Sequence, residues 1–161
     1  MKEKNFLQKY FKDFSDLIKH DQEIIDKLIS IRNLIIKTKK NKCKTLVFGN
    51  GGSAAIASHF SLDLTKNAGV RCVNFNEPSL ITCLANDYGF ENWISKAMEI
   101  YSDKGDLLIL ISSSGTSKNM VNAANISKKY KINKVITFTG FNKNNPLNKI
   151  GDINLWVNSQ S

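Results

Sequence analysis

The stretch Thr45-Leu46-Val47-Phe48-Gly49-Asn50-Gly51-Gly52-Ser53-Ala54-Ala55 decides the fold, because a short apolar run leads through a glycine-rich turn into a helical segment. From residue 45 onward such runs alternate with helical segments, which is typical of βαβ units and a parallel sheet. The apolar runs cover residues 45–48, 71–75, 106–111, 135–138 and 153–157, and helices are predicted over about 53–67, 79–86, 92–101 and 117–130. We therefore expect an α/β fold: a doubly wound, five-stranded parallel sheet of flavodoxin-like order 2-1-3-4-5, flanked by helices.

The segment before the sheet, residues 1–43, carries apolar side chains at three- and four-residue steps. This spacing predicts two amphipathic helices, or one helix kinked near residues 20–21. Their apolar stripes are broad for helices that cover one small sheet, so a subunit interface is expected. We predict a single domain over 1–161, with oligomerisation helices at 1–43 and an α/β core at 44–161.

The composition is that of an ordinary folded globule, with 42% hydrophobic and 23% charged residues. The three cysteines lack CxxC spacing, which argues against both a disulfide framework and a zinc knuckle. The N-terminus has no signal-peptide pattern, and no segment approaches the roughly 20 apolar residues of a membrane span. The sequence therefore predicts a cytoplasmic protein without a membrane partner.

The formal charge of +9 raises the possibility of nucleic-acid binding. However, residues 1–44 hold 12 Lys/Arg against 6 Asp/Glu, and the remaining 11 against 8 leave only +3 for the predicted sheet. The basic cluster at residues 37–44 closes a helical stretch, where cations complement the helix dipole. With no RNA-binding aromatic signature or helix-turn-helix pattern, we expect no nucleic-acid partner.

Two loops rich in Gly and Ser follow the first and third predicted strands, which are neighbours in the expected sheet. The first is Gly49-Asn50-Gly51-Gly52-Ser53, and the second is Ser112-Ser113-Ser114-Gly115-Thr116-Ser117. Both open helices, whose N-terminal N–H groups favour an anion, and the second adds five hydroxyls. A glycine turn or a serine cap would explain either loop alone. The pair at one crevice favours a phosphate or polyol ligand.

Nucleotide sites are the competing interpretation of the glycine loop. A Walker A motif is excluded because no Gly-Lys-Ser/Thr follows the glycines. A dinucleotide site stays open, since Gly49-x-Gly51-x-x-Ala54 fits its fingerprint and Glu77 lies where a ribose ligand would be expected. The serine loop has no role in that site.

His59 and Asp63 lie four residues apart on the helix after the glycine loop, hence on one helical face. Such a pair can ligate a metal or supply a base beside a bound sugar, although it is also a common surface hydrogen bond.

Four segments together resemble the sugar isomerase (SIS) domain and, within it, the phosphoheptose isomerase family. They are FGNGGSAAIASHFSLDLTKN, ITCLANDYGFENW, LILISSSGTSKNMVNAA, and KVITFTG with GDINLWV, in the family's order across most of residues 45–157. The resemblance implies aldose-ketose isomerisation of sedoheptulose 7-phosphate to D-glycero-D-manno-heptose 7-phosphate through an enediol, in a homotetramer. The alternative is a phosphosugar-binding or partner-binding SIS protein without catalysis.

The family's pattern also assigns roles to individual residues. The sugar and its phosphate would be held by Asn50, Gly51, Gly52, Ser53, Asp87, Ser112, Ser113, Ser114 and Ser117. His59 would match a zinc ligand, and Asp63 the position where many members carry a glutamate that binds metal and moves the proton. Family members continue into a helix that supplies a Gln or Glu and a His. Because this chain stops at Ser161, we expect an incomplete zinc site and activity that depends on those missing groups.

Overall fold

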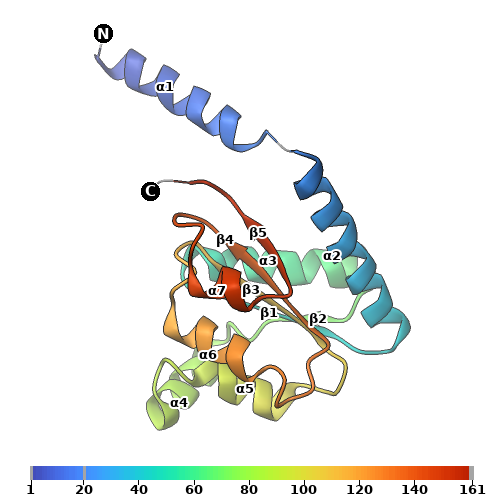
Figure 1. Ribbon diagram of the computed structural model, residues 1–161. Coiled ribbons are helices and arrows are strands. Elements are labelled where there is room, and N and C mark those ends of the chain that lie inside the picture. Colours follow the sequence, from blue (N-terminus) through green and yellow to red (C-terminus); the bar gives the residue numbers. More distant parts are fainter. Residues whose placement is uncertain (1, 20, 160–161) are drawn as a thin grey trace.

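The computed structural model describes residues 2–19 and 21–159 (Figure 1). The helices are α1 (Lys2–Leu17), α2 (Gln22–Lys40), α3 (Gly52–Lys66), α4 (Pro78–Tyr88), α5 (Trp93–Tyr101), α6 (Lys118–Ile126) and α7 (Pro146–Ile150). The strands are β1 (Thr45–Gly49), β2 (Cys72–Val73), β3 (Leu107–Ser112), β4 (Lys134–Thr139) and β5 (Ile153–Trp156).

The five strands form one parallel sheet in the order β2-β1-β3-β4-β5, which confirms the predicted fold class. The β1–β3 ladder runs from Thr45 opposite Leu107 to Gly49 opposite Ile111. These central strands are buried on both faces, which explains why they are continuous apolar runs without alternation. The sheet brings together the ends of two strands that are far apart in the sequence.

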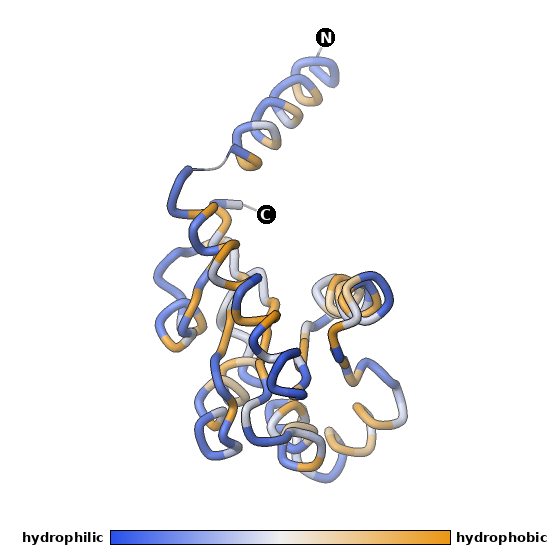
Figure 2. The backbone as a smooth tube through the Cα atoms, turned by 90° about the vertical axis from the view of Figure 1, so that its right-hand side faces the viewer, coloured by the Kyte–Doolittle hydropathy of each residue, from blue (hydrophilic) through white to orange (hydrophobic). Residues whose placement is uncertain are grey.

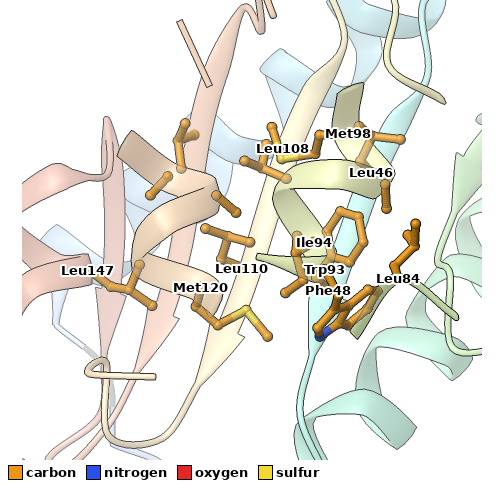
Figure 3. Packing of buried hydrophobic residues seen from close by; sticks show 14 residues of the cluster. Leu46, Phe48, Leu84, Trp93, Ile94, Met98, Leu108, Leu110, Met120 and Leu147 are labelled. Atoms are coloured by element: carbon orange, nitrogen blue, oxygen red, sulfur yellow. The ribbon is translucent and has the colours of Figure 1, made fainter. Parts of the chain in front are cut away.

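Helices cover both faces of the sheet and bury one apolar cluster on each. Helices α4 to α7 cover one face, where Phe48 packs edge-on against Trp93 with ring centroids 5.7 Å apart (Figure 3). Helices α2 and α3 cover the other face, where Val47 and Ile109 join Ile31 and Ile35 of α2. Alternate residues of β1 thus anchor both layers.

The N-terminal segment forms two helices and not one kinked helix. Asp21 caps α2, and its Oδ1 accepts a hydrogen bond from the backbone N–H of Ile24 at 2.9 Å. α2 reaches the sheet, whereas α1 projects away from it and every described residue of α1 remains at least partly exposed (Figure 1). The hydropathy-coloured tube shows apolar residues recurring along α1 (Figure 2).

Three elements differ from the sequence prediction. β2 has two residues where five were expected, and α6 ends at Ile126 because residues 127–130 form turns. The five-residue helix α7 was not predicted, since it is too short to show a period. None of the helices in the described residues combines the length and apolar character needed to cross a membrane.

Candidate functional site

The glycine loop and the serine loop meet at the carboxyl ends of β1 and β3, where Gly49 pairs with Ile111. The chain leaves β1 into α3 on one face of the sheet and leaves β3 into α6 on the other. Connections that diverge in this way open a crevice at the switch point of a doubly wound sheet, the usual ligand site of such folds. The predicted convergence of the two loops is present.

The glycine loop brings the start of α3 close to β1 and leaves open space in front of it. A Cβ on Gly49 would lie 2.2 Å from the carbonyl oxygen of Ser53, so only glycine permits this approach. Gly51 has a φ of +53°, and a Cβ on Gly51 or Gly52 would meet nothing within 4 Å. The N-terminus of a 15-residue helix therefore faces free volume, where its N–H groups can receive an anion.

The serine loop is held in shape by its own hydroxyls and by the segment after β4, where the N–H of Gly140 donates to the carbonyl oxygen of Ser113 at 2.9 Å. The Oγ of the buried Ser112 lies 3.4 Å from the Oγ of Ser117 and accepts from the N–H of Gly115 at 3.3 Å. Ser114 Oγ accepts from the N–H and the hydroxyl of Thr116 at 3.3 and 3.1 Å. The side chains of Ser114 and Ser117 are half-buried and that of Ser113 is exposed, so all three hydroxyls can reach a ligand.

Asn119, which sequence reasoning missed, links the two loops. Its side-chain amide exchanges two hydrogen bonds with the amide of Asn50, at 2.9 and 3.0 Å, although the residues are 69 positions apart. Asn119 is 2% exposed. In the sequence, Asn119 could be noticed only as an amide residue at the start of the helix after the serine loop. That it pairs with Asn50 can be predicted only when the order of the strands is known.

Asp87 lies on the exposed surface of α4. Its described hydrogen bonds stay within that helix: Asn86 Nδ2 donates to Oδ1 at 3.0 Å, and the thiol of Cys83 lies 3.9 Å from Oδ2. The structure thus assembles Asn50, Gly51, Gly52 and Ser53 with the serine loop, while no described contact joins Asp87 to either loop.

His59 and Asp63 are brought to each other but not into the crevice. His59 Nε2 lies 3.4 Å from Asp63 Oδ2, and the two side chains are 77% and 51% exposed. Because a helix rises about 1.5 Å per residue, the pair lies roughly 10 and 16 Å along α3 from Gly52. Asn67 Nδ2 donates to the other carboxylate oxygen at 3.1 Å. The pair faces outward, beside the exposed Ile56 and Leu62.

A zinc ion does not fit the residues that the structure describes. Within residues 2–19 and 21–159 no three His, Cys, Asp or Glu side chains gather closely enough to hold a metal. His59 and Asp63 supply two ligands, whereas a catalytic zinc site normally has three from the protein. His20 lies outside the described residues.

Glu77, the residue that kept a dinucleotide site open, is used as a helix cap. Its carboxylate accepts hydrogen bonds from the N–H groups of Ser79 and Leu80, at 3.0 and 2.7 Å, at the start of α4. These backbone bonds, with the Ser79 hydroxyl, hold the pKa of Glu77 below its usual value. The cap gives Glu77 a structural role and weakens the dinucleotide interpretation.

A surface groove of about 500 Å³ lies elsewhere, between α5 and α6. Two of its charged side chains are paired, because Glu99 accepts from Lys96, and Glu99 also accepts from the hydroxyl of Tyr130, both at 3.0 Å. None of the residues that line this groove belongs to the glycine or serine loop. We place the candidate site at the two loops, where free helix N-termini and uncharged donors converge.

The chain is similar to known proteins over most of its length. The model of the SIS domain family matches residues 9–140. A phosphoheptose isomerase of Aliarcobacter butzleri is 38% identical over 144 residues, which are 86% of this chain and 74% of the relative. One of Glaesserella parasuis is 37% identical over 126 residues, 75% of this chain and 65% of the relative. The solved phosphoheptose isomerase of Neisseria gonorrhoeae superposes with a TM-score of 0.79 at 28% identity, covering 94% of this chain and 84% of that one.

Proposed function

Because the chain belongs to the SIS domain family and, within it, to the phosphoheptose isomerases, we propose that it isomerises sedoheptulose 7-phosphate to D-glycero-D-manno-heptose 7-phosphate. The observation that carries this proposal is the convergence of two helix N-termini, each preceded by a loop of small donors, at the β1/β3 switch point. Such a donor-rich cradle can hold both a dianionic phosphate and the hydroxyls of a polyol.

We assign the phosphate to the serine loop and the sugar hydroxyls to both loops. Ser112, Ser113, Ser114 and Ser117 offer hydroxyls at the N-terminus of α6, whose dipole favours negative charge. Gly51, Gly52 and Ser53 line the opposite wall, where the glycines leave room for the sugar chain. Asp87 remains a proposed sugar contact that a neighbouring element would have to bring into reach.

The reaction moves one proton between two carbons. A base removes a proton from C1 of the ketose while the C2 carbonyl oxygen gains one, which gives an enediol. The proton then returns to C2, and the C1 hydroxyl loses its proton to become the aldehyde. We propose Asp63 as the base, acting at the crevice of a neighbouring copy, since its half-exposed carboxylate faces outward from α3 and His59 lies close enough to orient it.

Self-association is part of this proposal, as a homotetramer formed through the N-terminal helices and α3. The exposed fractions of Phe6, Phe11, Phe14 and Ile18 in and just after α1 lie between 53% and 67%. A lone 16-residue helix is only marginally stable in water, so a stripe of this kind calls for a partner. On α3, Ile56 and Leu62 expose a second apolar surface beside His59 and Asp63. A second copy on that face would bring Asp63 to a neighbouring crevice.

We also propose a cytoplasmic location. Cys43, Cys72 and Cys83 are all free thiols, as expected in a reducing compartment. Burial raises the pKa of the Cys72 thiol to about 12, so this thiol stays protonated and unreactive.

The test is an isomerisation assay combined with calorimetric binding of sedoheptulose 7-phosphate. We expect wild-type protein to bind the sugar and form the aldose, and Asp63→Asn to bind it but lose turnover, because the amide is not a base. Asp26→Asn on α2 is the matched control and should behave as wild type. Binding without turnover in wild type would indicate a phosphosugar-binding protein, and full activity of Asp63→Asn would show that the base lies elsewhere.

A further inference from the structure

The two loops of the site are joined by one reciprocal amide pair. Asn50 Nδ2 donates to Asn119 Oδ1 at 3.0 Å, and Asn119 Nδ2 donates to Asn50 Oδ1 at 2.9 Å. Asn50 is the first residue after β1, within the glycine loop, and Asn119 lies in the first turn of α6 behind the serine loop. Two opposed hydrogen bonds fix both the separation and the relative orientation of the side chains that share them.

The orientation of the pair is set by the backbone around it. The N–H of Met120 donates to Asn119 Oδ1 at 3.0 Å, so the opposite orientation of this amide would place two donors together. The orientation of Asn119 in turn dictates that of Asn50. Because Asn119 is 2% exposed, its side of the pair is shielded from water.

Asn50 also takes part in the start of α3 through its backbone. Its carbonyl oxygen accepts the N–H of Ser53 at 3.0 Å, which begins the first turn of the helix. The same residue therefore joins the N-terminus of α3, through its carbonyl, to the N-terminus of α6, through its side chain. Both helix ends point at the proposed phosphosugar site.

We propose that Asn50 and Asn119 are a positioning pair that holds the glycine loop and the serine loop at the spacing needed to engage one phosphosugar molecule. This inference rests on the proposed function. The amide of Asn50 gives one donor and one acceptor to Asn119, so its main role is to hold the loops rather than to contact the sugar. Asn119 holds the loops together indirectly, by fixing the side chain of Asn50.

Breaking the pair should affect ligands that contact both loops more than ligands that contact one. Inorganic phosphate needs only the serine loop, and its affinity should change less than about twofold when the pair is broken. Sedoheptulose 7-phosphate needs both loops, and its affinity should fall about tenfold in Asn50→Ala and in Asn119→Ala, the usual cost of one or two lost hydrogen bonds. Because each substitution breaks the same link, the double variant should be no weaker than either single one.

The experiment measures both dissociation constants by amide chemical-shift titration, on variants whose near-ultraviolet circular dichroism shows native packing. Asn122→Ala is the matched control, since Asn122 lies one turn further along α6 and donates to Glu91 instead of to a site loop. Asn119→Ser, which keeps a small polar group, replaces Asn119→Ala if the alanine variant does not fold.

Three results would overturn the inference. Wild-type affinity for the phosphosugar in Asn119→Ala or Asn119→Ser would show that the link is dispensable. Additive losses in the double variant would show that the two residues act separately. Failure of the wild-type protein to bind sedoheptulose 7-phosphate would overturn the proposed function and this inference with it, whereas the first two results leave the proposed function standing.

Discussion

Ser114 holds its hydroxyl at the rim of the serine loop, where two groups of Thr116 already donate to its oxygen. The hydroxyl hydrogen is then free to be donated to a ligand. We predict that Ser114→Ala weakens sedoheptulose 7-phosphate binding by about 1.5–3 kcal/mol, the range for a hydrogen bond to a charged group. Calorimetric titration measures it, with Ser30→Ala on α2 as control. An unchanged dissociation constant would remove Ser114 from the site.

Asp106 is fully buried at the amino end of β3, far from the crevice along the sheet. Its carboxylate accepts the backbone N–H groups of Lys44 and Asp103, at 2.9 and 2.8 Å, and lies 2.6 Å from Lys44 Nζ. Burial opposes the charge of Lys44, but hydrogen bonds from its ammonium to Asp103 and Asp106 still hold the Lys44 pKa above its usual value.

We predict that Asp106→Ala lowers the free energy of unfolding by about 3–5 kcal/mol, because two N–H groups lose their partner and the ammonium of Lys44 keeps only the exposed Asp103. Urea denaturation measures the loss. Asp103→Ala removes a carboxylate from the same ammonium at a side chain that is 76% exposed, so its effect should be far smaller. Equal losses in the two variants would contradict the role of burial.

At the scale of residues, the sequence indicated the site through chemistry that stands out locally. Glycines and clustered hydroxyls at strand ends predicted both loops, and the i, i+4 spacing predicted the His59–Asp63 contact. The Asn50–Asn119 amide pair could not be predicted from the sequence, because it depends on sheet order and burial. The cap formed by Glu77 was missed because the same carboxylate also fitted a nucleotide motif.

At the scale of elements, the close approach of α3 to β1 depends on Gly49. A Cβ there would lie 2.2 Å from the Ser53 carbonyl oxygen and 2.7 Å from the Ala54 nitrogen, so backbone has to move. We predict that Gly49→Ala destabilises the fold by roughly 1–3 kcal/mol, as overpacking usually does, and weakens phosphosugar binding by shifting the start of α3.

Thermal unfolding and calorimetric binding measure both effects of Gly49→Ala. Gly52→Ala is the matched control for stability, because a Cβ at that position meets nothing within 4 Å. Should Gly49→Ala melt at the wild-type temperature, the helix would be shown to approach the strand less closely than this.

The elements themselves were predictable where apolar runs were long. β1, β3 and β4 are buried on both faces, and each was expected within one or two residues of its bounds. β2 lies at the edge of the sheet, and only two of the five residues in its predicted run form a strand. α7 begins at the Asn145-Pro146 cap. The helix is too short to show the periodic apolar spacing by which the longer helices were predicted.

In the whole molecule, α1 is the helix whose apolar side chains the rest of the chain does not bury (Figure 2). We predict that the protein in solution has four times the 18.1 kDa mass of one chain. Phe11→Glu with Phe14→Glu should dissociate it, because charges replace two apolar side chains of the stripe. Light scattering gives the mass, and Lys9→Glu, on the polar side of α1, is the control. A wild-type monomer would refute the assembly.

The order of the strands has a consequence for when the site comes into being. In the centre of the sheet β1 pairs with β3, so Thr45 must come opposite Leu107 before the sheet is complete. Local helices form within about a microsecond, whereas pairing of such distant segments is slow. During refolding the helices should therefore precede the crevice, and the ability to bind a phosphosugar should arrive with the last cooperative step. Conversely, no partly unfolded form that has separated β1 from β3 can retain the ligand.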